Sequence, residues 1–179
     1  MAQDRFSRLG AFAHFGSGST ISQPWNCIDG VDRIHIGDRF HANTGLFLGA
    51  YGDATGDPQI VIGNDVIVNY DCQITAVCKV EVGDEVLFGS RVLITDHLHG
   101  AIDSGALSLP PIRRKLYSKG PVSIGNRVWI GSGVVVLPGV SIGDNCIIGA
   151  NSVVTRSFGP GSVIAGAPAR LVRELADES

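Results

Sequence analysis

A tripeptide made of a β-branched residue, Gly, and Asp or Asn occurs five times along the chain. The copies begin at Ile36, Ile62, Val82, Ile124 and Ile142. Their spacings are 26, 20, 42 and 18 residues, so each equals an 18-residue unit plus 8, 2, 24 or no inserted residues. A fixed period of this kind indicates a repeat fold, in which each unit packs against its neighbours.

Within each unit an apolar residue recurs every six positions. The recurrence predicts three interior columns: Ile36, Ile62, Val82, Ile124 and Ile142; Ala42, Val68, Phe88, Ile130 and Ile148; and Leu48, Ile74, Ile94, Val136 and Val154. Amphipathic helices place apolar residues three and four apart, so a period of six disfavours helix. Three short strands per unit, each with one inward side chain, predict an all-β parallel β-helix of about five triangular coils.

The polar residues of the tripeptide are expected at the corners between strands. Gly has no Cβ, which relieves crowding at a tight corner and permits unusual backbone dihedrals. The following Asp or Asn is expected to hydrogen-bond its own backbone at the turn.

Composition predicts one domain spanning residues 1–179 and excludes several classes of function. The net charge is −3, and no basic run is longer than Arg113–Lys115, which disfavours nucleic-acid binding. No segment resembles a secretory signal or a membrane span. The 4 Cys lack CxxC spacing and are expected to be buried, reduced thiols of a cytoplasmic protein.

Two insertions interrupt the repeat, at residues 49–59 and 96–121. Solenoid proteins often carry function on such excursions, and the longer insertion is the stronger candidate. The shorter one is expected to be a connector. Residues 166–179 are expected to cap the last coil with a short helix that places Leu171, Val172 and Leu175 on one side.

The densest chemistry lies where the long insertion begins, at Asp96, His97 and His99. An imidazole suits general-base catalysis, because its ordinary pKa of about 6.5 lies near working pH. Two alternatives remain open: ordinary surface histidines, or a metal pair. Zinc needs three or four ligands, and the remaining histidines lie well upstream.

Several segments together resemble the left-handed β-helix acetyltransferases, in particular the sugar O-acetyltransferases of surface-polysaccharide gene clusters. These segments are the hexapeptide repeat itself, DHLHG at 96–100, SKGPV at 118–122, VWIGS at 128–132, PGVSIG at 138–143 and GAPARLVRE at 166–174. The resemblance implies a left-handed helix and a homotrimer with active sites between subunits. It also implies acetyl-coenzyme A as co-substrate, no required metal, and a sugar or glycan acceptor.

The resemblance also assigns roles to individual residues. It implies His99 as the general base and Asn69 as an active-site asparagine, with His97 and Asp96 able to orient or replace the base. The implied coenzyme A contacts are Ser132, Ala150, Thr155, Arg156, Arg170 and Arg173, and Trp129 is expected to form a wall of the same groove. An acidic sugar-binding residue of the galactoside enzymes falls at Thr75–Val77, where this chain has no carboxylate.

The function expected from these observations is transfer of an acetyl group from acetyl-coenzyme A to a sugar hydroxyl. One alternative is N-acetylation of an amino sugar or antibiotic. Alternatives of another class are a metal-dependent hydratase like the γ-carbonic anhydrases and a catalytically inactive assembly module, since a fold does not fix a function.

Overall fold

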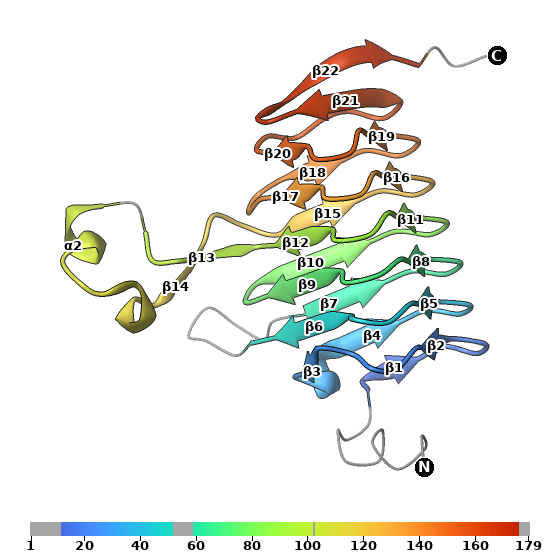
Figure 1. The fold of residues 1–179 in the computed structure, drawn as a ribbon, viewed down its shortest axis with the longest axis horizontal. Helices are drawn as coiled ribbons and strands as arrows, with labels where there is room; N and C mark the ends of the chain where they lie inside the picture. Colours follow the sequence, from blue (N-terminus) through green and yellow to red (C-terminus); the bar gives the residue numbers. More distant parts are fainter. Residues whose placement is uncertain (1–11, 52–58, 102, 176–179) are drawn as a thin grey trace.

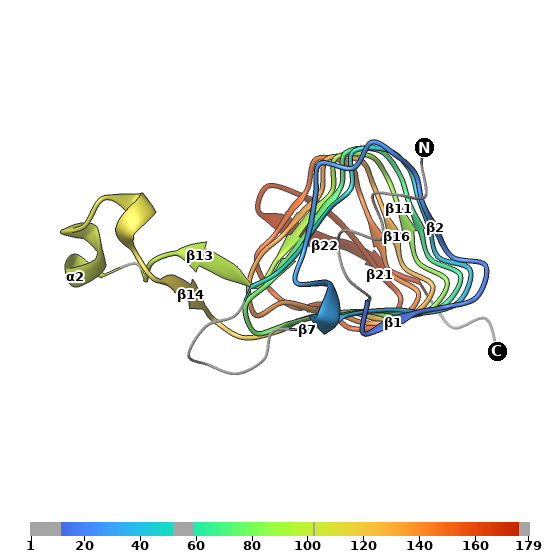
Figure 2. The ribbon, with the colours of Figure 1, turned by 90° about the horizontal axis from the view of Figure 1, so that it is seen from below.

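The computed structural model describes residues 12–51, 59–101 and 103–175. Three sheets form the faces of a triangular prism, and the chain winds around it from face A to face B to face C (Figures 1 and 2). Face A contains β1 (His14–Phe15), β4 (Ile34–Ile36), β7 (Gln59–Ile62), β10 (Lys79–Val82), β15 (Val122–Ile124) and β18 (Ser141–Ile142). Face B contains β2 (Thr20–Ile21), β5 (His41–Ala42), β8 (Ile67–Val68), β11 (Leu87–Phe88), β16 (Trp129–Ile130), β19 (Ile147–Ile148), β21 (Ser162–Gly166) and β22 (Ala169–Glu174). Face C contains β3 (Cys27–Asp29), β6 (Phe47–Ala50), β9 (Gln73–Ala76), β12 (Leu93–Thr95), β17 (Val135–Val136) and β20 (Val153–Val154).

The strand register confirms all three predicted columns. Each column residue pairs with the next member of its own column, as in Ile62 with Val82 and Phe88 with Ile130. All fifteen column residues are at most 3% exposed. A second buried residue lies two positions before most column residues, as with Ile34 in β4 and Phe40 just before β5, because alternate residues of extended backbone share a face.

The predicted count of about five coils is too low: the described residues form six complete coils, and a seventh begins where Phe158 bridges to Ile142 and continues in β21. The missed coil precedes the first tripeptide and runs through β1, β2 and β3. Its inward column residue Ile21 pairs with Ala42, and Ile28 pairs with Leu48. Phe15, Gly16 and Ser17 stand where later coils carry the tripeptide. An aromatic residue in place of a β-branched one conceals the repeat there.

The corners differ from expectation in two respects. The tripeptide Gly residues do not have positive φ; a Cβ on Gly63 would lie 2.8 Å from the carbonyl carbon of Gly83 in the next coil, so close approach of the coils requires glycine. Positive φ falls two residues later, as at Asp65 with φ 55°. The Asp and Asn side chains bond the neighbouring coil rather than their own turn: Asn64 Oδ1 accepts from the Asp38 N–H at 2.8 Å.

The long insertion forms an arm that projects from one corner of the prism (Figures 1 and 2). We call residues 96–121 the arm. It contains an antiparallel hairpin of β13 (His97–His99) and β14 (Leu116–Ser118). The short helices α2 (Ser104–Leu107) and η2 (Pro111–Arg113) lie beyond the hairpin. Of the shorter insertion, residues 52–58 lie outside the described residues.

The predicted C-terminal helix is wrong, because the chain forms strand β22 there. This strand pairs antiparallel with β21, with Ala165 opposite Arg170. The apolar residues that would have formed a helix face are exposed, Val172 by 62%. A strand satisfies the open hydrogen-bonding edge of the last coil, which a helix cannot do. Residues 176–179 of the predicted cap lie outside the described residues, and no helix in the described part of the chain is long and apolar enough to cross a membrane.

Candidate functional site

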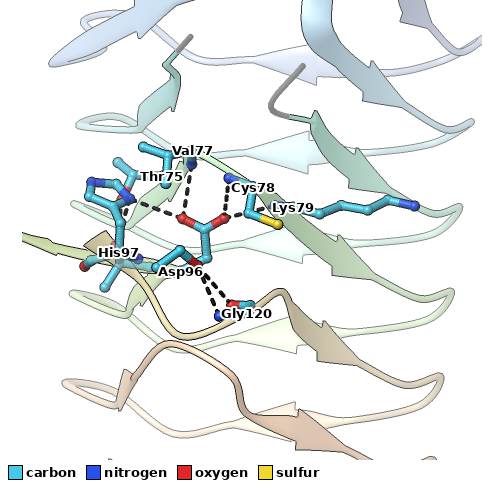
Figure 3. A network of polar contacts seen from close by, with 9 residues as sticks. Thr75, Val77, Cys78, Lys79, Asp96, His97 and Gly120 are labelled. Atoms are coloured by element: carbon cyan, nitrogen blue, oxygen red, sulfur yellow. Dashed lines mark hydrogen bonds and ion pairs between the residues drawn. The ribbon is translucent and has the colours of Figure 1, made fainter. Parts of the chain in front are cut away.

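A buried carboxylate stands where the arm leaves the prism (Figure 3). Asp96 follows β12 directly and is 0% exposed. Its Oδ1 accepts from the Val77 N–H at 2.9 Å, and its Oδ2 accepts from the N–H groups of Cys78 and Lys79, both at 2.7 Å. His97 Nδ1 lies 3.0 Å from Oδ1. The Asp96 carboxylate therefore joins the arm to the turn between β9 and β10.

The two histidines of the arm have different environments. Because alternate residues of a strand share a face, His97 and His99 point to the same side of the hairpin. The His97 side chain is only 10% exposed, whereas His99 is exposed. Within the part of the chain that the structure describes, no hydrogen bond or ion pair engages the His99 imidazole. His99 is thus the histidine that an external molecule can reach.

Tyr51 also contacts this site, although nothing in the sequence identifies it as a site residue. Its ring meets the His97 ring edge-on, with centroids 5.9 Å apart. Burial, followed by the charges of Cys27 and Asp29, raises the pKa of the Tyr51 phenol. Tyr51 therefore remains a neutral hydroxyl near neutral pH. It follows β6, more than forty residues before His97, and only the stacking of coils brings the two together.

A second group of predicted residues lies at the corner between faces B and C. Asn69 follows β8, and its amide donates to the Phe88 carbonyl at 2.8 Å. Ser132 and Ala150 occupy the same corner in higher coils, where Ser132 Oγ accepts from the Ser90 N–H at 3.1 Å. Arg170, in β22 just after the turn from β21, pairs with Ala165 and extends this corner toward the C-terminal end of the prism. These residues form a line along the prism axis.

The remaining predicted coenzyme A contacts lie elsewhere on the prism. Thr155 and Arg156 follow β20 and share the corner between faces C and A with the arm; the Arg156 guanidinium lies over the Phe158 ring at 5.1 Å. Trp129 and Arg173 lie on face B, with Trp129 54% exposed. One chain therefore does not bring all the predicted site residues together, because the Asn69 corner and the arm corner are separated by face C.

A cavity of about 410 Å³ lies at the base of the arm. It is lined by Val77, Cys78, Leu116, Tyr117, Ser118, Lys119 and Gly120. The cavity therefore adjoins the turn that Asp96 binds. It also includes Val77 of the Thr75–Val77 segment, which has no carboxylate.

The cysteines and acidic residues show no metal-site arrangement in residues 12–51, 59–101 and 103–175, where no group of three or more His, Cys, Asp or Glu side chains could hold an ion. All four cysteines are free thiols, with Cys72 and Cys146 buried and Cys27 and Cys78 partly exposed. The expectation that all four are buried is therefore correct for two.

Comparison with known proteins identifies the class. The family described as bacterial transferase hexapeptide (six repeats) matches residues 121–156. The putative lipopolysaccharide biosynthesis O-acetyl transferase WbbJ of Escherichia coli is 38% identical over 150 residues, which cover 82% of this chain and 74% of WbbJ. The chain belongs to the hexapeptide-repeat transferases.

Solved structures agree with this assignment. A maltose O-acetyltransferase from Clostridium difficile superposes with a TM-score of 0.64 at 30% identity, covering 98% of this chain and 75% of that one. A galactoside acetyltransferase in complex with coenzyme A superposes with a TM-score of 0.63 at 31% identity, covering 93% and 66%. The prism is accordingly a left-handed parallel β-helix.

Proposed function

We propose that this protein is an acetyltransferase that moves an acetyl group from acetyl-coenzyme A to a hydroxyl of a sugar or glycan precursor. The observation that carries the proposal is its similarity over most of its length to O-acetyltransferases, including one solved with coenzyme A. The accessible imidazole on the arm is the general base that such a reaction needs. The assignment of WbbJ to lipopolysaccharide biosynthesis supports a sugar or glycan precursor as the acceptor.

In the proposed reaction His99 accepts the proton of the acceptor hydroxyl as its oxygen attacks the thioester carbonyl carbon. The new carbon–oxygen bond forms, and the carbon–sulfur bond then breaks. The leaving sulfur of coenzyme A takes the proton from the His99 imidazolium. Backbone N–H groups at the edge of a coil are candidates to stabilise the oxyanion, a contribution commonly worth about 3 kcal/mol per donor. No acyl-enzyme is needed.

Coenzyme A is proposed to lie along the prism axis, using small residues for the pantetheine arm and arginines for phosphate. Ser132 and Ala150 leave room beside the backbone of their corner. Arg170 is exposed at the end of the same line. Guanidinium groups pair with phosphate through two parallel hydrogen bonds, so Arg170 and Arg173 of one subunit suit the charged end of the ligand. Arg156 lies at the arm corner and would reach that ligand from a neighbouring subunit.

The active enzyme is proposed to be a homotrimer with active sites between subunits. Asn69 lies at one corner of the prism and the arm leaves from another, so a second copy is needed to bring Asn69 and His99 together. Exposed apolar residues on face B, namely Ile67, Leu87 and Trp129, provide surface that a neighbouring subunit could cover.

The cavity at the base of the arm is proposed to bind part of the acceptor. Lys119 contributes a cation to it, and its Val77 belongs to the Thr75–Val77 segment, which carries no carboxylate. Residues 97–119 carry four Lys or Arg residues and one Asp. This excess of positive charge favours an acceptor with a phosphate or carboxylate group over a neutral disaccharide.

The test is release of coenzyme A thiol from acetyl-coenzyme A in the presence of a panel of sugars, sugar phosphates, nucleotide sugars and amino sugars. The product is then located by mass spectrometry and NMR. O-acetylation of a sugar is the expected result. Acetylation of an amine alone would establish the N-acetyltransferase alternative, and absence of both transfer and coenzyme A binding would contradict the proposal.

A further inference from the structure

The Asp96 carboxylate has every acceptor position filled, although it lies in a buried site. A carboxylate offers about four lone-pair positions. Here Oδ1 faces the Val77 N–H and His97 Nδ1, and Oδ2 faces the N–H groups of Cys78 and Lys79. A buried carboxylate is tolerated when it is hydrogen-bonded in this way. Such a cluster holds its members in one geometry and leaves little freedom at the base of the arm.

The same cluster fixes the His97 ring from two sides. Both Asp96 oxygens act as acceptors, so the hydrogen of the short contact belongs to His97 Nδ1. On another side the ring meets Tyr51, and only 10% of the side chain is exposed. The Thr95 hydroxyl lies 3.4 Å from Nδ1 and 3.1 Å from the Thr75 hydroxyl, which extends the polar cluster into the neighbouring coil.

We infer that Asp96 and His97 form a positioning pair that fixes the start of β13 and thereby holds His99 at the acceptor, while His97 itself takes no proton from the acceptor. The inference rests on the proposed function for its kinetic consequences. His97 and His99 are two residues apart on one face of the hairpin, so a rotation of the strand at His97 displaces the His99 imidazole. Displacement of a catalytic group by about 1 Å can lower the rate about a hundredfold.

The decisive variants are His97→Asn and His97→Ala. The Asn amide nitrogen can stand in for Nδ1 as the donor to Asp96, but it has no basic nitrogen. If His97 is a positioning residue, His97→Asn should keep kcat within about tenfold of wild type, and His97→Ala should lower it substantially further. His35→Ala, on face A, is the matched control and should leave kcat unchanged.

Asp96→Asn tests the other half of the pair. An amide offers one acceptor oxygen, so its NH₂ group faces backbone donors that it cannot satisfy. We expect a fall in kcat similar to that of His97→Ala, with unchanged affinity for coenzyme A.

A readout independent of activity separates this inference from the proposed function. In ¹⁵N NMR spectra of the wild-type protein, the His97 ring should show a protonated Nδ1. The amides of Val77, Cys78 and Lys79 should exchange slowly, and Asp96→Asn should accelerate them. If the NMR result holds but no acetyl transfer occurs, the pairing stands, while the proposed function and the assignment of His99 as its base fail. A His97 ring with an unprotonated Nδ1, or a His97→Asn variant as inactive as His97→Ala beside an active His99→Ala, would overturn the inference.

Discussion

At the residue scale, function is expected to depend most on His99. It is exposed on the hairpin face and makes no side-chain hydrogen bond within the described part of the chain. Replacing it by Ala should lower kcat at least about a hundredfold, the usual scale for loss of a general base. Steady-state kinetics checks kcat, and calorimetry with coenzyme A checks that cofactor affinity barely changes. Full activity in His99→Ala would show that the base lies elsewhere.

Stability at the residue scale depends on glycines where coils approach closely. A Cβ on Gly125 would meet Asp144 Oδ1 and would lie 2.8 Å from the Asp144 amide nitrogen. Gly125→Ala should therefore destabilise the fold by about 1–3 kcal/mol through overpacking. Gly159→Ala is the control, because nothing lies within 4 Å of the position that a Cβ on Gly159 would occupy. Thermal unfolding of both variants measures the difference, and equal melting temperatures would contradict the argument.

The buried cysteines should be chemically inert. Burial raises the pKa of the Cys72 thiol, and burial likewise raises that of Cys146, so less of the reactive thiolate is present near neutral pH. Both should react with iodoacetamide at least about tenfold more slowly in the native protein than after unfolding. Peptide mass spectrometry after timed labelling measures the rates. Rapid native labelling of Cys72 or Cys146 would show that the coils open there.

At the element scale, the arm is the part of the fold expected to select the acceptor. Residues 103–115 carry the exposed cations Arg113 and Lys115, whereas Arg114 donates through Nε to the Leu109 carbonyl within the arm. Replacing this segment by a short Gly-Ser linker leaves β13 and β14 in place. The acceptor KM should rise while coenzyme A affinity stays the same.

A matched charge variant separates recognition by charge from recognition by shape. Arg113→Gln combined with Lys115→Gln removes two exposed cations and keeps the arm. If the acceptor is anionic, this variant should reproduce much of the rise in KM measured for the linker variant. Unchanged acceptor kinetics in both proteins would mean that the tip of the arm has a structural role.

At the scale of the whole molecule, the separation of Asn69 from His99 on one prism predicts complementation between subunits. Asn69→Ala and His99→Ala should each be strongly impaired alone. In a trimer reassembled from an equal mixture, about a quarter of the sites should contain both wild-type residues. Activity of the mixture should thus approach about a quarter of wild type, and light scattering should give a trimer. A monomer, or a mixture no more active than its parents, would contradict the proposed assembly.

The sequence by itself determined the β-helix, its three interior columns and the position of the arm. These features follow from side-chain periodicity, which is local: every sixth residue must be apolar to face the same interior, and an insertion shows as a break in that period. The first coil was not predicted, because Phe15 and Ser17 replace the β-branched and acidic or amide residues that mark the later coils. The C-terminal strand was not predicted, because a short apolar pattern such as Leu171–Leu175 fits either a helix or a strand. Only the unpaired sheet edge beside it decides for the strand.

The tertiary structure alone decided how the candidate site is arranged. The sequence places Asp96, His97 and His99 together but does not distinguish a buried side chain from an accessible one. Stacking brings the turn at Val77–Lys79 and the ring of Tyr51 against this segment, across gaps of 17 to 46 residues. Those contacts bury Asp96 and His97 and leave His99 exposed. Burial and hydrogen-bond partners depend on which coils become neighbours, and that is a property of the folded prism rather than of any one segment.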